Sequence, residues 1–104
     1  MGINLLILHN NSCPSLEPTV QRISEVLEEN NLKASLSTKL LENDQEARDW
    51  EFAGSPTIYI NDIQFEPIDS NLYRLENCRT FINDEGGISP IPSKNKLQKA
   101  LLKA

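Results

Sequence analysis

The chain begins with a nearly continuous apolar run. Ile3, Leu5, Leu6, Ile7 and Leu8 are interrupted only by Asn4. A short run of this kind is typical of a strand that is buried on both faces, as in a parallel sheet. The sequence therefore predicts that the chain opens with a central strand.

The next block has the spacing of an amphipathic helix. Proline is favoured at a first helical position, so we expect this helix to begin at Pro14 and to end at Asn30-Asn31. Glutamates occupy its other faces, while apolar residues recur at spacings of four, three and four over Leu16, Val20, Ile23 and Leu27.

A half-buried strand and a short helix are predicted next. From Lys33 to Lys39, Ala34, Leu36 and Thr38 alternate with serines, which predicts a strand with those three residues facing inward. Asn43 with Glu46 three residues later resembles a capping box, and Gly54 is expected to stop the helix. We expect Trp50 and Phe52 in the core.

The second half of the chain predicts a hairpin and a last helix. Strand patterns run from Thr57 to Ile60 and from Ile63 to Glu66, around the tight turn Asn61-Asp62. The last helix, from Pro92 to Lys103, places Leu97, Ala100 and Leu101 on one face. Between them, 67–90 is expected to be a long irregular segment with one helical turn around Leu72 to Thr80. The order predicts a single α/β domain over 1–104, with a four-stranded mixed sheet and three flanking helices.

Composition limits the classes of partner that this chain can bind. A net charge of −5 opposes binding to nucleic acid or to an anionic membrane surface. The first apolar run is too short to span a bilayer and lacks the features of a leader, so we expect a cytoplasmic protein. The absence of a long exposed apolar run favours a monomer, although the fourth strand lies at a sheet edge and could pair with another chain.

Cys13 is the residue with the clearest chemical potential. It lies in Ser12-Cys13-Pro14-Ser15, between the first strand and the first helix. Unpaired N–H groups and the positive end of the dipole at a helix N-terminus favour thiolate over thiol. The pattern therefore predicts a reactive sulfur at Cys13.

Gly54-Ser55-Pro56-Thr57 is the second signal, placed immediately before the third strand. Taken alone, Gly-Ser-Pro would indicate only a turn. With the Cys-Pro turn after the first strand, however, the chain resembles a minimal thioredoxin-like fold over residues 3–66 and 91–104, with 67–90 as an extra segment. The resemblance implies a cis bond at Ser55-Pro56, with the proline facing the thiol.

The two-cysteine motif of that family is absent, because Leu16 stands where its second cysteine would be. Leu16 belongs to the apolar face of the helix, which leaves a monothiol mechanism, a resolving cysteine elsewhere, or a binding module without redox chemistry. Cys78 is the candidate for a resolving thiol, since the strand directions bring 67–90 back towards Cys13. Cys78 as a small buried hydrophobe is an equal alternative.

Arg79 follows Cys78 directly and would stabilise a thiolate or orient an anion. The resemblance thus implies a thiol–disulfide oxidoreductase acting on protein or small-molecule thiols and disulfides, with Cys13 as its catalytic nucleophile. The strand directions add Cys78 as the candidate second catalytic residue, which would resolve the mixed disulfide. The alternative is a non-catalytic module that binds a peptide or small thiol compound. We expect no cofactor, and no metal because zinc-type ligand spacing is missing. Substrate contacts are assigned to Pro14, Ser55, Pro56, Thr57 and Arg79.

Overall fold

The computed structural model describes residues 2–52, 54–67, 73–77 and 79–104. Its elements follow one another in the predicted order, with one additional pair of short strands late in the chain. They are β1 (Ile3–His9), α1 (Leu16–Glu29), β2 (Ala34–Leu40), α2 (Asp44–Asp49), β3 (Thr57–Ile60), β4 (Ile63–Gln64), β5 (Phe81–Ile82), β6 (Ile88–Ser89) and α3 (Lys94–Lys103).

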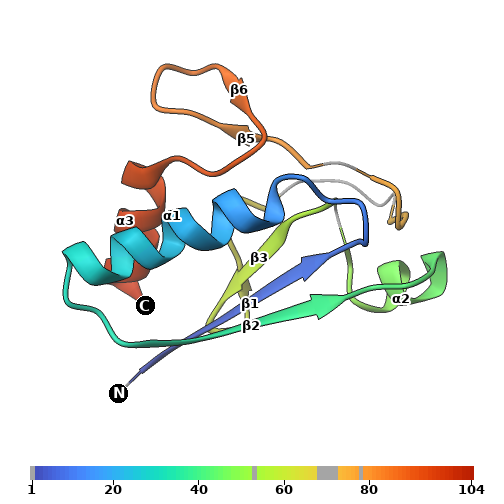
Figure 1. Ribbon diagram of the computed structural model, residues 1–104, viewed down its shortest axis with the longest axis horizontal. Coiled ribbons are helices and arrows are strands. Elements are labelled where there is room, and N and C mark those ends of the chain that lie inside the picture. The colour runs from blue at the N-terminus through green and yellow to red at the C-terminus, as the bar shows by residue number, and fades with distance from the viewer. Residues whose placement is uncertain (1, 53, 68–72, 78) are drawn as a thin grey trace.

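The main sheet is four-stranded and mixed, in the order β2-β1-β3-β4. β1 pairs in parallel with β2 and antiparallel with β3, and β4 returns antiparallel to β3. The apolar run is therefore a central strand, as predicted, because only a strand with neighbours on both sides and helices over it buries most of its side chains. Figure 1 shows α1 and α3 side by side over the sheet, with α2 at the end where β1 and β2 finish.

The hairpin of β3 and β4 forms at the predicted turn. Asn61 and Asp62 both have positive φ angles, 49° and 69°, as the two central residues of a tight hairpin turn require. The side-chain oxygen of Asn61 also accepts a hydrogen bond from the N–H of Asn4 at 2.8 Å. The turn is thereby tied to the beginning of β1.

Alternation along β1 divides the interior into two clusters. Ile3, Leu5 and Ile7 pack with α1 and α3, where Leu97 and Leu101 are buried, as the last-helix pattern predicts. On the other face, Leu8 packs with Ala47 of α2 and with Phe52 in a smaller cluster. On the edge strand β2, Ala34 and Leu36 contact the main cluster as expected, but Thr38 is exposed, which corrects its assignment to the inner face.

The short helix α2 has the predicted cap but a different end. The side chain of Asn43 accepts a hydrogen bond from the N–H of Glu46 at 2.9 Å. The helix ends at Asp49, before Gly54, and the chain reverses at Glu51, whose φ is 52°. Phe52 is consequently fully buried, whereas Trp50 is 40% exposed, so the prediction that Trp50 lies in the core is wrong.

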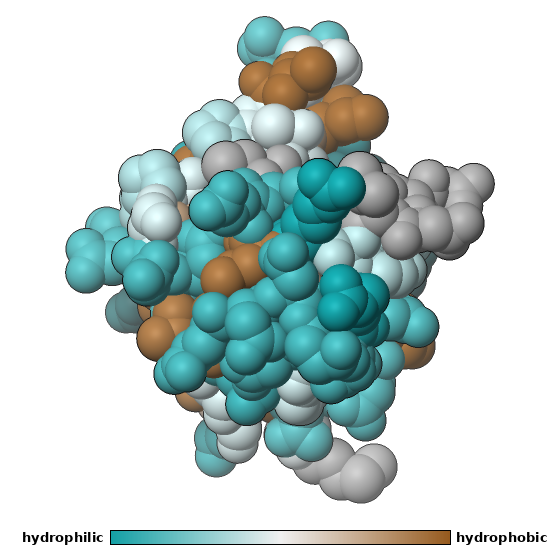
Figure 2. All heavy atoms as spheres, turned by 90° about the vertical axis from the view of Figure 1, so that its right-hand side faces the viewer, coloured by the Kyte–Doolittle hydropathy of each residue, from teal (hydrophilic) through white to brown (hydrophobic). Residues whose placement is uncertain are grey.

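The described part of segment 67–90, residues 67, 73–77 and 79–90, is more regular than the sequence predicts. Phe81–Ile82 pairs antiparallel with Ile88–Ser89 in a separate two-stranded sheet. Of the expected helical turn, the described residues form one backbone turn, in which the N–H of Asn77 donates to the carbonyl of Arg74. Hydrophobic atoms appear at the top of Figure 2, where Figure 1 places this hairpin, and it carries the exposed side chains of Ile82 and Ile88.

The side of the molecule that carries α2 is otherwise mostly hydrophilic (Figure 2). Among the helices that the structure describes, none combines the length and the apolar character needed to cross a membrane.

Candidate functional site

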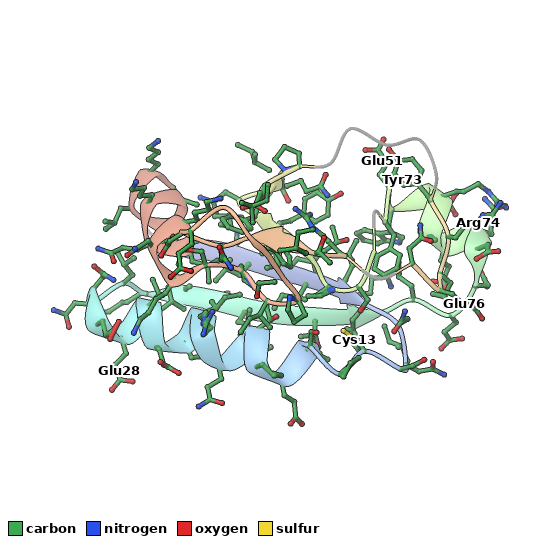
Figure 3. All side chains as sticks on the ribbon, turned by 90° about the horizontal axis from the view of Figure 1, so that it is seen from above. Cys13, Glu28, Glu51, Tyr73, Arg74 and Glu76 are labelled. Carbon is green, nitrogen blue, oxygen red and sulfur yellow. The ribbon has the colours of Figure 1, made fainter. Side chains whose placement is uncertain are left out.

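Cys13 lies in the loop between β1 and α1, half-buried and as a free thiol. Figure 3 shows it at the beginning of α1, at the opposite end of that helix from Glu28 and on the side where Glu76 lies. The position at the carboxyl end of a central strand is the one that the sequence predicts. A loop position leaves the thiol partly accessible, in contrast to a cysteine packed in the core.

The helix begins later than predicted, at Leu16, with Ser15 as the N-terminal cap. Pro18 explains the difference. A helix starting at Pro14 would place Pro18 beyond the first turn, where its missing N–H and its ring would disturb the bond to the carbonyl of Pro14. Starting at Leu16 keeps Pro18 in the first turn, where no N–H is needed. Cys13 therefore lies two residues before the cap, outside the helix proper.

A pocket of about 380 Å³ lies beside Cys13. Four of the predicted site residues line it together: Cys13, Pro14, Ser55 and Arg79. Glu76, Thr80 and Pro90 close it from the long segment after β4. The expectation that this segment returns to the Cys13 end of the sheet is confirmed by these contacts.

The Ser55–Pro56 peptide bond is cis, the isomer that the sequence analysis expects. Of the three residues assigned here, only Ser55 lines the pocket. Pro56 and Thr57 are buried behind it, and the hydroxyl of Thr57 donates a hydrogen bond to the carbonyl of Gly54. Thr57 therefore holds the turn before β3, while Ser55 is the residue of this turn that a ligand would meet.

Asn10 organises the pocket, and the sequence analysis missed it. Its side-chain amide donates to the carbonyl of Leu75 at 2.9 Å, and its side-chain oxygen accepts from the N–H of Ser12 at 3.2 Å. Its own N–H donates to Oγ of Ser55 at 3.3 Å. One nearly buried asparagine thus links the Cys13 loop to two other walls of the pocket. An asparagine directly after a buried strand was the only signal in the sequence.

The long segment is fastened to the site through Ser55 as well. The N–H of Ser55 donates to the carbonyl of Asn77 at 3.0 Å, and the N–H of Arg79 donates to the carbonyl of Ser55 at 3.2 Å. Gly54 allows this approach, since a Cβ at that position would lie 2.7 Å from the backbone nitrogen of Arg79. Cys78, the predicted resolving thiol, lies outside the described residues.

Arg79 is only 3% exposed, and its guanidinium contacts the interior. Nη2 donates to the carbonyls of Phe65 and Glu66, and the group lies 4.5 Å from the ring centre of Phe81. Nε and Nη1 have no hydrogen-bond partner among the described residues. Burial lowers the pKa of the Arg79 guanidinium to about 10, an effect that the carboxylate of Glu66 partly opposes. Arg79 remains a cation at neutral pH and braces the wall of the pocket.

Chemically, the pocket offers one thiol, the hydroxyls of Ser12, Ser15, Ser55 and Thr80, and a carboxylate from Glu76. Within the part of the chain that the structure describes, no group of three or more His, Cys, Asp or Glu side chains is placed to hold a metal ion. The arrangement suits covalent chemistry or binding at sulfur.

Comparison with known proteins adds little to this picture. No family model matches the chain, and no curated protein matches it. Among solved structures, a chain described as "Structure of a malarial protein" is similar over 70% of this chain and 85% of its own length, with 16% identity and a TM-score of 0.47. A similarity this weak carries no argument about fold family or activity.

Proposed function

We propose that the protein is a thioredoxin-like thiol–disulfide oxidoreductase with Cys13 as its nucleophile. One observation carries the proposal: Cys13, which follows β1, and Ser55, which precedes β3, line the same pocket. The strand order β2-β1-β3-β4 and the position of the Ser55–Pro56 turn support the fold assignment. A chain with two cysteines that act as thiols suits a reducing compartment, so we infer a cytoplasmic enzyme.

The first chemical step is attack by the Cys13 thiolate on one sulfur of a substrate disulfide. A new bond forms between Cys13 and that sulfur, the substrate S–S bond breaks, and the other sulfur leaves as a thiolate that takes up a proton. The half-buried position of Cys13 admits such a substrate through the pocket, and Ser55 lies beside the approaching sulfur.

Release of the mixed disulfide needs a second thiol, and we assign this step to Cys78. Its thiolate attacks the sulfur of Cys13, the substrate leaves as a thiol, and a Cys13–Cys78 bridge remains. The protein dithiol is then oxidised and the substrate disulfide is reduced. The described neighbours of Cys78 in sequence, Asn77 and Arg79, both bond the backbone of Ser55 in the wall of the same pocket.

The test is to mix the reduced protein with glutathione disulfide, or with a peptide whose two cysteines form a disulfide. The products are followed by intact mass and peptide mapping. We expect the wild type to end as an intramolecular Cys13–Cys78 bridge, with release of substrate thiol. Cys78→Ser should accumulate the mixed disulfide at Cys13, and Cys13→Ser should release no thiol.

Ser24→Cys provides a control, because position 24 is an exposed site on α1 and does not line the pocket. In a Cys13→Ser background, the thiol introduced at this control position should react no faster than a small-molecule thiol. Reaction of Cys13 at the same rate as the control thiol, or a bridge that never forms, would contradict the oxidoreductase proposal.

One observation favours the alternative of a non-catalytic binding module. Leu16, at the position of the missing second cysteine, packs against the main core, so no thiol is available within the first turn of α1. In this alternative the same pocket binds a peptide or small thiol compound without turnover. The binding-module alternative would be supported if a thiol compound binds saturably without thiol release and if Ser55→Trp abolishes this binding.

A further inference from the structure

A second and larger hollow, of about 610 Å³, lies between β4 and α3. It shares no residue with the pocket beside Cys13. It lies next to the Asn61-Asp62 turn, which is bonded to the beginning of β1, whereas Cys13 follows the other end of that strand. We refer to it as the β4–α3 groove; the residues that matter in it are Ile63, Gln64, Lys96, Lys99, Ala100 and Lys103.

One wall of the β4–α3 groove is an open sheet edge. β4 is the outermost strand, and in its antiparallel register Gln64 stands opposite Tyr59. The N–H of Phe65 donates to the carbonyl of Ile58 at 2.8 Å, so Phe65 bonds towards β3. Hydrogen-bonding directions alternate along an antiparallel strand, and the N–H and carbonyl of Gln64 therefore point away from β3. They are the groups that an added strand would pair with.

Two side chains of β4 are also incompletely covered. The side-chain nitrogen of Gln64 is buried and has no hydrogen-bond partner among the described residues. Next to it on the strand, Ile63 is 73% exposed, although it is a large aliphatic residue. The exposed isoleucine is covered by an occupant that offers apolar side chains, whereas the Gln64 side chain, on the neighbouring residue, points to the opposite face of the sheet.

The other wall of the groove is positively charged. Lys96, Lys99 and Lys103 follow the helical spacing that places them along one stripe of α3. Lys96 lies 3.6 Å from the carboxylate of Glu66, but neither Lys99 nor Lys103 takes part in an ion pair within the described ranges. In a chain of net charge −5, this concentration of unpaired lysines favours an acidic occupant.

We propose that the β4–α3 groove binds an extended acidic segment of a partner protein. The segment adds a strand to β4 through the backbone of Gln64, places apolar side chains over Ile63 and Ala100, and presents carboxylates to Lys99 and Lys103. Main-chain pairing supplies affinity in this mode, and side-chain pockets and charges supply specificity. The inference is independent of the thiol chemistry at Cys13.

The probe is a capped peptide of the pattern Val-Thr-Glu-Thr-Val-Thr-Glu, in which Val and Glu share one face of the extended chain. It is titrated into the full chain and followed by amide resonances. We expect saturable shifts at β4 and α3, and slower hydrogen exchange of the Gln64 N–H in the complex. A peptide with Lys in place of Glu should not bind. A peptide with a central Pro, which removes a main-chain donor, should bind weakly.

Two matched charge reversals test the lysines. Lys99→Glu should weaken binding at least about fivefold, because it places a carboxylate against the carboxylates of the peptide. Lys33→Glu changes the net charge equally at an exposed residue outside the groove and should leave the affinity within about twofold. Equal weakening by both reversals would overturn the proposal, and so would a Gln64 N–H that exchanges at the free rate. If dodecanoate shifts the β4 and α3 resonances and the peptide does not, the acidic-peptide proposal is overturned and the occupant is a lipid-like anion.

Discussion

The N–H of Asn10 donates a hydrogen bond to Oγ of Ser55 at 3.3 Å and so joins the loop after β1 to the turn before β3. The same asparagine also holds Leu75 and Ser12 through its side chain. The loop that carries Cys13 is therefore positioned by a residue that has no chemistry of its own. Loss of the Asn10 side chain should disturb the pocket and the position of the Cys13 loop, although the thiol itself is unchanged.

We predict that Asn10→Ala lowers the free energy of unfolding by about 1–3 kcal/mol, since it leaves the carbonyl of Leu75 and the N–H of Ser12 without partners. Urea unfolding gives this value, and hydrogen exchange should become faster at Ser12. Asn11→Ala is the control, because Asn11 is exposed and its side chain, among the residues that the structure describes, bonds only the hydroxyl of Ser12. A similar loss in both variants would show that Asn10 does not organise the pocket.

Alanine substitutions at Gly54 and Gly86 distinguish the cost of backbone strain from the cost of a steric clash. Both have positive φ angles, 143° and 87°. A Cβ at Gly54 would collide with Arg79, whereas a Cβ at Gly86 would meet no atom of the described residues within 4 Å. Gly86→Ala should cost about 1 kcal/mol of unfolding free energy through conformation alone. Gly54→Ala should cost clearly more and should loosen the 77–79 segment. If thermal unfolding gives equal losses of stability for the two variants, the close approach of the Arg79 backbone to Gly54 is refuted.

The buried charge of Arg79 should appear in the pH dependence of stability. Its folded-state pKa, about 10, is lower than the ordinary value of 12.5, mainly through burial. As pH rises through about 10, the folded protein releases a proton that the unfolded chain still holds, so this group's contribution to stability increases with pH.

The measurement for Arg79 is the unfolding free energy of the wild type minus that of Arg79→Met, taken between about pH 8 and pH 11. Taking the difference removes the titration of groups that do not interact with Arg79. Because Tyr59 does interact with it, both proteins carry Tyr59→Phe. We expect the difference to rise above about pH 9. A difference that stays flat over this range would show that the Arg79 guanidinium is not buried as a cation.

Phe52 and Trp50 should respond differently to truncation. Phe52 is fully buried with Leu8, Leu41 and Ala47, so Phe52→Ala should lower the unfolding free energy by about 3–5 kcal/mol. Trp50 is 40% exposed, and Lys39 lies 5.2 Å from its ring centre. Trp50→Ala should cost about 1 kcal/mol, the loss of one exposed cation–aromatic contact. Chemical denaturation of the two variants distinguishes these costs, and a larger loss at Trp50 would contradict the packing.

The sequence by itself determined the features that depend on near neighbours. The apolar run of β1, the cap at Asn43 and the turn at Asn61-Asp62 all appear where local spacing and turn chemistry predict them. The start of α1 was also within reach of the sequence, because Pro18 excludes a helix that begins at Pro14. Cys13 and Ser55 were found because each sits in a short motif beside a predicted strand.

Tertiary structure decided what depends on distant partners. Trp50 and Phe52 are equally apolar in sequence, and only the reversal at Glu51 exposes the first and buries the second. The β5–β6 pair is too short for any periodic pattern to reveal. Asn10 acquires its role from Leu75, 65 residues away, and Arg79 is buried because Phe65, Glu66 and Phe81 gather around it. The role of a buried polar side chain depends on its hydrogen-bond partners, and the tertiary fold determines which groups those are.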